Sequence, residues 1–204
     1  MQDRHIMRRA PILFLIILLT GGFFGGSFTA ASDKPDFTPI FDGKTLDGWE
    51  GEPQRWRVEN GAIVGEIPKG EKLGHNTWLV WKDGKLENFE LRVDFRLSGL
   101  PAANSGIQIR CQVEGVKKVS GYQADLDMGA KWLGRIYDEH GRALLVERGT
   151  RVLIEEDGER AVEQFASASR YAALFRQNDL NDYRIRACDE HVTIDVNGTL
   201  FSEL

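Results

Sequence analysis

Short apolar runs with a period of two dominate the chain from Phe37 onward, and turn-forming pairs separate them. This alternation is typical of antiparallel β-strands that have one face in a core and the other in water. In the clearest run, residues 89–97, Phe, Leu and Val alternate with Glu, Arg and Asp. Similar runs occupy residues 107–113, 122–127, 183–187 and 192–196.

The turn signals support the same reading. Asn60-Gly61 and Asn197-Gly198 each separate two apolar runs and suit two-residue type I′ hairpins, while Asp83-Gly84 and His140-Gly141 are weaker versions of the signal. Only residues 163–175 have a helical apolar stripe. About a dozen strands with one short helix predict a single all-β sandwich or jelly roll.

The start of the chain has a different composition. Three arginines and one aspartate precede an apolar run at residues 10–24, and small residues follow it. The run is shorter than a membrane span, so residues 1–31 are predicted to be a secretory signal peptide cleaved after Ala31. We expect export to the bacterial periplasm or the exterior, without stable membrane insertion after cleavage. An uncleaved membrane anchor is the alternative.

Charge and cysteine content narrow the class of protein. The formal net charge is -5, and loss of the leader's three Arg and one Asp makes the mature chain more acidic, at about -7. Such a chain is a poor nucleic-acid binder, because that affinity needs a cationic surface. Cys111 and Cys188 are too few for a disulfide scaffold. One bridge is allowed after export, but two half-buried thiols are favoured, with Cys111 on an apolar face and Cys188 on a polar one.

The polar faces of the central strands are rich in chemically versatile side chains. Alternation places Gln123, Asp125 and Asp127 on one side of a strand, at steps of about 7 Å. Arg110 lies on a neighbouring strand, and Arg135 and Tyr137 follow on the next segment. Carboxylates, amides, guanidinium groups and an aromatic ring on one concave face suit a sugar. A solvated lattice of salt bridges is the alternative.

Several motifs in a fixed order resemble those of the 3-keto-disaccharide hydrolase domain family, also called DUF1080. The opening block is Phe37-Thr38-Pro39-Ile40-Phe41-Asp42-Gly43-Lys44-Thr45-Leu46-Asp47-Gly48-Trp49. The later blocks are residues 56–65, 89–96, 104–110, 121–125 and 181–186. Together they cover nearly all of residues 32–204, so the ordered set is more specific than any single block.

The resemblance implies a concanavalin A-like jelly roll with a polar concave groove. It also implies an exported hydrolase, or an elimination and hydration lyase, that cleaves glycosides whose C3 hydroxyl has become a ketone. The family usually continues past the Asn197-Gly198 hairpin with a final strand. We therefore expect the domain at residues 32–204 to be C-terminally incomplete and to leave one sheet edge unpaired.

The chemistry of such a substrate suggests roles for individual residues. A ketone at C3 acidifies the C2 hydrogen, so cleavage needs a base, a donor for the enolate oxygen and an acid for the leaving group. We expect Asp125 to be the base, Arg110 the oxyanion stabiliser, and Glu139 or His140 the acid. A divalent cation held by Asp125 and Asp127 could replace the arginine. The alternatives are a structural Arg110–Asp125 pair and plain turn residues at 139 and 140.

The remaining candidate residues bind the sugar. We expect these contacts from Asn104, Gln123, Asp127, Tyr137, Arg142 and Trp132. Trp132 lies in a loop and offers an aromatic platform, whereas alternation points Tyr122 into the core. The expected partner is a small molecule or oligosaccharide. The competing hypothesis is a lectin-like carbohydrate-binding module with no turnover, because fold alone does not decide between the two.

Overall fold

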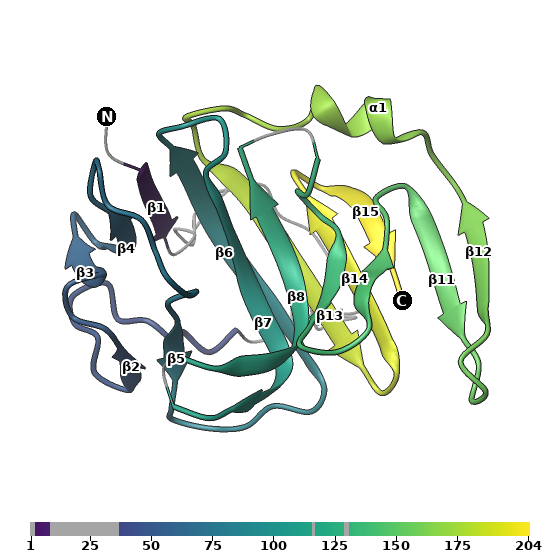
Figure 1. The fold of residues 1–204 in the computed structure, drawn as a ribbon, viewed down its shortest axis with the longest axis horizontal. Coiled ribbons are helices and arrows are strands. Elements are labelled where there is room, and N and C mark those ends of the chain that lie inside the picture. The colour runs from purple at the N-terminus through teal and green to yellow at the C-terminus, as the bar shows by residue number, and fades with distance from the viewer. Residues whose placement is uncertain (1–2, 9–36, 116, 129–130) are drawn as a thin grey trace, which may run out of the picture.

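The computed structural model describes residues 3–8, 37–115, 117–128 and 131–204. Over these residues the chain forms two packed β-sheets, a two-stranded ribbon and one short helix. The small sheet lies over the middle of the large one (Figure 1). The predicted all-β sandwich is therefore confirmed. Within the same residues, no helical segment has the length and hydropathy needed to cross a membrane.

The large sheet has nine strands among the described residues. In spatial order they are β12 (Arg160–Gln164), β11 (Thr150–Ile154), β15 (Thr199–Glu203), β14 (His191–Val196), β13 (Asn181–Cys188), β6 (Phe89–Ser98), β1 (Asp3–Arg8), β4 (Ala62–Ile67) and β3 (Trp56–Glu59). Neighbouring strands are antiparallel except β11 and β15, which are parallel. β1 pairs with both β4 and β6, and β15 is paired on both sides.

The small sheet carries the site described below. Its strands, in spatial order, are β10 (Ala143–Val146), β9 (Ile136–Glu139), β8 (Val119–Asp127) and β7 (Asn104–Val113). The ribbon pairs β2 (Trp49–Gly51) with β5 (Leu79–Trp81), and the helix is α1 (Ala168–Ala172). All neighbours in the small sheet are antiparallel.

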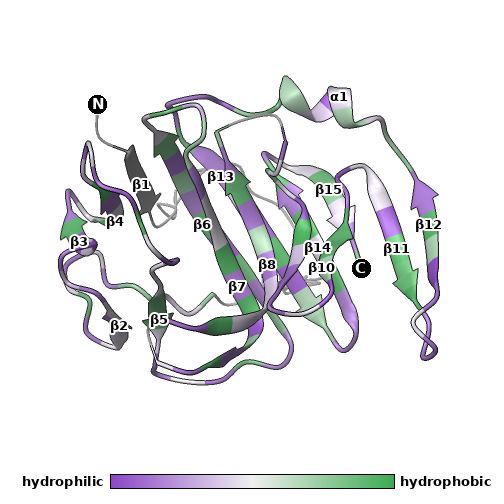
Figure 2. Ribbon diagram, viewed as in Figure 1, coloured by the Kyte–Doolittle hydropathy of each residue, from purple (hydrophilic) through white to green (hydrophobic). Residues whose placement is uncertain are grey.

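The core lies between the two sheets and follows from the alternation of the strands. In β8, Ala124 and Leu126 are buried in the core, and in β13 Tyr183, Ile185 and Ala187 are buried against them. Apolar and polar bands alternate along the strands (Figure 2). Because successive side chains of a strand point to opposite faces of the sheet, the residues between these core residues point away from the core.

The two strong turn predictions are confirmed. Asn60 and Gly61 have φ values of 52° and 74°, and Asn197 and Gly198 have 50° and 74°, so both pairs adopt the left-handed conformation of a type I′ turn. The weaker signals behave differently. His140 has a φ of 59° without a left-handed residue after it, and neither residue of Asp83-Gly84 has a positive φ.

Two predictions about local structure are wrong. The helix expected over residues 163–175 is confined to α1, because residues before it complete β12 and Phe165 and Ala166 donate to the Gly149 carbonyl. Cys111 is exposed rather than on an apolar face, because β7 has a bulge there. Both cysteines are free thiols, and both are exposed, so the expected half-burial is wrong for Cys188 as well.

Most of the predicted leader lies outside the described residues. Its residues 3–8 form β1, and residues 9–36 are not described. Cleavage after Ala31 and export stay predictions.

Candidate functional site

A pocket of about 490 Å³ lies on the face of the small sheet that points away from the core. This volume is within the range of small-molecule sites. The floor comes from β7, β8 and β9, and the walls come from the loops before β5, between β6 and β7, and between β8 and β9. The lining residues are Asn76, Pro101, Ala102, Asn104, Gln123, Asp125, Asp127, Lys131, Trp132, Tyr137 and Glu139.

Asp125 lies in the floor of this pocket. Its neighbours Ala124 and Leu126 point into the core, so alternation turns its carboxylate outward. The surrounding loops nevertheless leave Asp125 only 3% exposed. The pocket thus contains a carboxylate that is almost fully removed from solvent.

Hydrogen bonds fix both the backbone and one oxygen of Asp125. Gln123 Nε2 donates to Oδ1 at 2.7 Å. The Asp125 carbonyl accepts from Gly134 N at 3.0 Å and from the Tyr183 hydroxyl at 3.1 Å. Oδ2 is buried and has no hydrogen-bond partner among the described residues. This second oxygen therefore has unused acceptor capacity in a residue that lines the pocket.

The environment raises the pKa of Asp125 to about 7. Burial is the main cause, because it disfavours the charged form. The Gln123 hydrogen bond and the nearby Arg135 oppose the rise, whereas the negative charges of Asp127 and Glu139 add to it. A carboxylate with a pKa near neutrality is suited to take up and return a proton.

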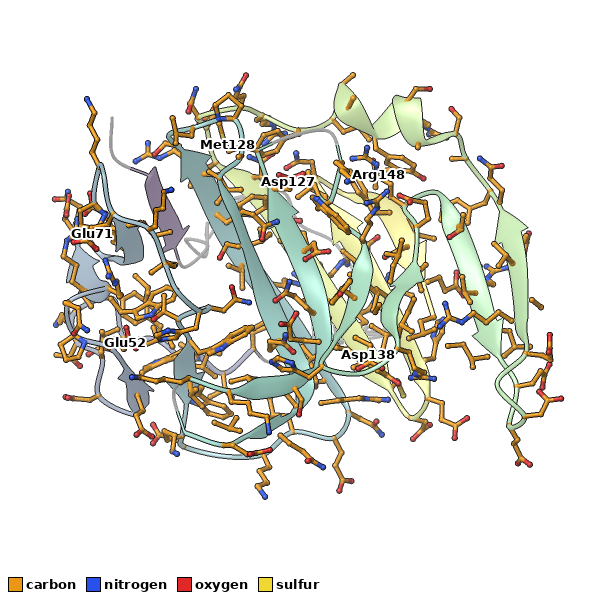
Figure 3. All side chains as sticks on the ribbon, viewed as in Figure 1. Glu52, Glu71, Asp127, Met128, Asp138 and Arg148 are labelled. Atoms are coloured by element: carbon orange, nitrogen blue, oxygen red, sulfur yellow. The ribbon has the colours of Figure 1, made fainter. Side chains whose placement is uncertain are left out.

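Asp127 organises the loop between β8 and β9. It is 5% exposed, and its Oδ2 accepts a hydrogen bond from Trp132 N at 2.8 Å. Figure 3 shows Asp127 at the upper end of β8, with Arg148 on the segment between β10 and β11. Arg148 is buried, and burial together with the charge of Arg135 lowers its pKa, while Glu147 and Asp127 oppose that change.

Trp132 lines the pocket as a half-buried aromatic side chain held by cations. The Arg135 guanidinium lies 4.6 Å from the ring centre, and Lys131 Nζ lies 4.7 Å from it. The ring of Tyr137 meets it edge-on, with 6.5 Å between centroids. Arg135 is itself held by a bidentate ion pair with Glu147. These contacts fix the orientation of Trp132 before any ligand binds.

The other polar groups of the pocket are less constrained. The Asn76 and Asn104 side chains are exposed and have no hydrogen-bond partner within the described part of the chain. Glu139 is half-buried, and its Oε1 lies 3.8 Å from His140 Nε2. Lys131 contributes the one Lys or Arg side chain that lines the pocket among the described residues.

The structure places seven of the ten predicted site residues in the pocket and three outside it. Arg110 has a φ of 47° and an exposed side chain at the β7 bulge, where the register shifts between Ile109 and Gln112. The bulge interrupts the strict alternation that had placed Arg110 beside Asp125. The predicted oxyanion role and the alternative Arg110–Asp125 pair therefore have no support from the geometry.

His140 and Arg142 also lie off the pocket wall. The side chain of His140 is 54% exposed on the turn after β9. Arg142 donates to the Tyr122 hydroxyl at 2.7 Å and to Asp138 Oδ2 at 3.1 Å, so its guanidinium is engaged by residues that do not line the pocket. Figure 3 labels Asp138 at this lower end of the small sheet. Tyr122 packs partly against the core, in line with the prediction from alternation.

The candidate cation site is not supported by the arrangement of side chains. Within the described residues, no group of three or more His, Cys, Asp or Glu side chains is placed to hold a metal ion. One oxygen of Asp125 and one of Asp127 accept hydrogen bonds from the protein itself.

Residues 36–204 match the family described as the 3-keto-alpha-glucoside-1,2-lyase-like domain. The chain belongs to this family. A curated relative from Bacteroides thetaiotaomicron, named 3-keto-disaccharide hydrolase, is 34% identical over an alignment of 82 residues, and the match covers 37% of this chain and 27% of that protein. The match thus spans about a quarter of the relative's length.

Among solved structures, the chain matches one from Parabacteroides distasonis, which is provisionally described as a glycosyl hydrolase. It is 20% identical, covers 82% of this chain and 71% of its own, and has a TM-score of 0.47.

Within this lyase-like domain, sequence reasoning missed four residues of the pocket. They are Asn76, Pro101, Ala102 and Lys131. All four lie in loops, where periodicity carries no information about direction. The one available signal was the position of Lys131 next to Trp132, which had been predicted as a platform.

Proposed function

We propose that this chain is a carbohydrate-active enzyme that cleaves the glycosidic bond of 3-keto-glycosides in the pocket of the small sheet. The observation that carries the proposal is Asp125, a carboxylate that is 3% exposed, has one unpartnered oxygen and has a pKa of about 7. A binding module has no need for a buried carboxylate poised to exchange a proton. Membership of the lyase-like family supports the substrate class.

In the first step, the Asp125 carboxylate takes a proton from C2 of the sugar. The electron pair of that C–H bond forms a C2=C3 double bond, and the C3 carbonyl oxygen becomes an enolate. Oδ2 is the acceptor, because Oδ1 is engaged by Gln123. The pKa of about 7 keeps a large fraction of the base ionised at neutral pH while leaving it basic enough to act.

The enolate oxygen needs a positive or hydrogen-bonding partner. Lys131 is suited to this role, because its ammonium group lies at the pocket wall against Trp132. The Asn76 and Asn104 amides line the same pocket and are further possible donors to this oxygen. Such groups favour the transition state most when they are in place before charge develops.

In the second step, the enolate re-forms the C3 ketone and a C1=C2 double bond, and the bond from C1 to the leaving oxygen breaks. Glu139 supplies the proton to that oxygen in this proposal, since it lines the pocket whereas His140 does not. Release of the unsaturated ketone at this point is lyase activity. Addition of water, with its hydroxyl at C1 and a proton at C2, completes hydrolysis.

The direct test is to incubate the purified protein with a 3-keto-glycoside and with the same glycoside unoxidised. We expect loss of the oxidised substrate alone, a fall of at least about 100-fold in kcat for Asp125→Asn, and a smaller fall for Glu139→Gln. Arg110→Ala is the matched control, because its side chain lies outside the pocket. Turnover that survives in a folded Asp125→Asn protein would refute the role of Asp125.

The second candidate function is carbohydrate binding without turnover. The observation that favours it is the Trp132 platform, since lectin-like sites rely on aromatic surfaces. Calorimetry with oxidised and unoxidised sugar separates the two functions. Equal binding of both sugars with no product would establish the binding module.

We also propose that residues 1–31 direct export and are then removed. The proposal rests on the basic start, the apolar run and the small residues before Ser32. N-terminal sequencing of the protein recovered from the periplasm or medium of a bacterial host should begin at Ser32. Recovery only from the cytoplasm, with Met1 retained, would refute it.

A further inference from the structure

A glycine lies opposite Asp125 in the sheet. Gly106 of β7 pairs with Asp125 of β8, and the next pair along the same face is Gln108 with Gln123. The φ of Gly106 lies outside the left-handed region, so the backbone itself does not require glycine there. Glycine weakens the interior of a strand, and it often marks a site where another group approaches the backbone closely.

The space above Gly106 is filled by the side chain of Gln123. A Cβ atom at position 106 would lie 2.5 Å from Cγ of Gln123, 2.6 Å from Cδ and 3.0 Å from Oε1. These distances are shorter than carbon atoms tolerate. Any other residue at position 106 would push Gln123 away from its place.

The nitrogen end of the Gln123 amide is used within the sheet, where Nε2 donates to Asp125 Oδ1 at 2.7 Å. The Gln108 amide lies 3.3 Å from Gln123 Oε1, but the Gln108 nitrogen is better placed to donate to the Gly121 and Tyr122 carbonyls, at 3.3 and 3.2 Å. When the Asp125 carboxyl is ionised it only accepts hydrogen bonds, so the Gln123 nitrogen is then the end that faces it. Gln123 thus directs its amide nitrogen at Asp125, although it also lines the pocket.

We propose that Gly106 and Gln123 are positioning residues for the base: the gap at Gly106 lets the Gln123 amide lie across the strand and hold Oδ1 of Asp125, which leaves Oδ2 facing the substrate. This inference rests on the proposed function for its catalytic meaning. It revises the role of Gln123 from sugar contact to orientation of the carboxylate.

The other charged and titratable groups around Asp125 do not replace this contact. Asp127 and Glu139 are negative and disfavour its ionised form, and Arg135 acts only through its charge. Tyr183, on the opposite sheet, bonds to the backbone carbonyl of Asp125 rather than to its carboxylate. Among the described residues, Gln123 is the donor that the Asp125 carboxylate has.

The test uses two variants that remove the contact in different ways. Gly106→Ala displaces the Gln123 side chain, and Gln123→Met keeps its length but removes the amide. In each, we expect the pKa of Asp125, measured from the pH titration of its ¹³C carboxyl resonance, to rise by about one unit. The acid limbs of both the kcat/KM and the kcat profiles should move by about the same amount, so that kcat below neutral pH falls about tenfold with a smaller change in KM.

Matched controls come from the same chain. Gly74 has open space around its Cα and no positive φ, and Gln112 is an exposed residue of β7. Gly74→Ala and Gln112→Met should leave both the titration and the kinetic profile unchanged. If Gly106→Ala fails to fold, Gln123→Met decides the question alone, because it changes no backbone preference.

The outcomes separate this inference from the proposed function. An unchanged titration of Asp125 in folded Gln123→Met overturns the positioning role. A raised pKa in that variant, together with a wild-type protein inactive on every 3-keto-glycoside tested, would retain the positioning role and reject the reaction. A rise in KM for Gln123→Met, with kcat and the pKa of Asp125 unchanged, would show that Gln123 contacts the sugar, and would also overturn the inference.

Discussion

The Asp125 carboxylate is buried although its strand turns it away from the core. Loops on three sides cover it, and only one of its oxygens has a hydrogen-bond partner among the described residues. Removing a charge from water without full compensation costs free energy, which the raised pKa expresses. The residue that gives the pocket its chemistry is therefore a source of instability in the fold.

This cost should appear as a pH-dependent stability. Because the folded-state pKa of about 7 lies above the unfolded value near 4, Asp125 favours folding at low pH, and this contribution is lost as the pH rises from about 4 to about 7. We expect Asp125→Asn to have a higher unfolding free energy than wild type at pH 8, by up to about 4 kcal/mol, and therefore a higher unfolding temperature. At pH 4 the two proteins should differ much less in unfolding free energy. Thermal unfolding at both pH values checks this; an equal difference at both would contradict it.

Trp132 should matter most for substrates with a second ring. Its fixed orientation beside Arg135 and Tyr137 suits stacking on a sugar or aryl leaving group. For Trp132→Ala, we expect KM to rise about tenfold for a 3-keto-disaccharide and about twofold for a methyl 3-keto-glycoside, since stacking contributes on the order of 1 kcal/mol. Steady-state kinetics on both substrates measure the ratio. The same change for both would place Trp132 outside the leaving-group site.

At the scale of elements, the sequence predicted those strands whose two faces differ in polarity. β6, β13 and residues 122–127 of β8 alternate in sequence, so their core-facing and outward-facing side chains could be assigned before the structure was known. β7 shows the limit of this reasoning, because one extra residue near Arg110 breaks the alternation and leaves no mark in the composition. The helix was overestimated because alanines fit a strand end and a loop as well as a helix.

The packing of β13 on β8 gives a prediction about stability. The Tyr183 hydroxyl is buried and donates to the Asp125 carbonyl across the sandwich. Tyr183→Phe should lower the unfolding free energy by about 1 kcal/mol, because it leaves a buried carbonyl with one partner fewer. Urea denaturation measures the difference. No change would mean that the Gly134 amide alone satisfies that carbonyl.

At the scale of the whole molecule, the large sheet depends on a strand from the predicted leader. β1 lies between β4 and β6, which do not pair with each other, so it joins the β3–β4 hairpin to the rest of the sheet. Export with cleavage after Ala31 would remove this strand. The predicted cleavage and the stability of the large sheet are therefore linked, because a cleaved protein lacks β1.

A chain that begins at Ser32 should be less stable than the full chain. We expect its β4 and β6 amides to exchange faster with solvent, because both strands lose a neighbour. Full-length Ile6→Pro is a matched control, since proline interrupts the hydrogen bonds of a central strand without shortening the chain. Hydrogen exchange by mass spectrometry compares the three proteins. Unchanged exchange in β4 and β6 of both variants would show that these strands do not rely on β1.

The Tyr183 hydroxyl also affects which amino-acid substitutions the protein should tolerate. It belongs to a core residue, yet its partner is the backbone of the residue proposed as the base. A mutational scan scored for activity should therefore mark Tyr183 as sensitive even where substitutes keep the protein folded. Neighbouring core positions without a bond to β8, such as Ile185 and Ile194, should tolerate aliphatic exchange in the same screen. Functional constraint on substitution would then reach a core residue of the opposite sheet, because one hydrogen bond joins Tyr183 to the backbone of Asp125.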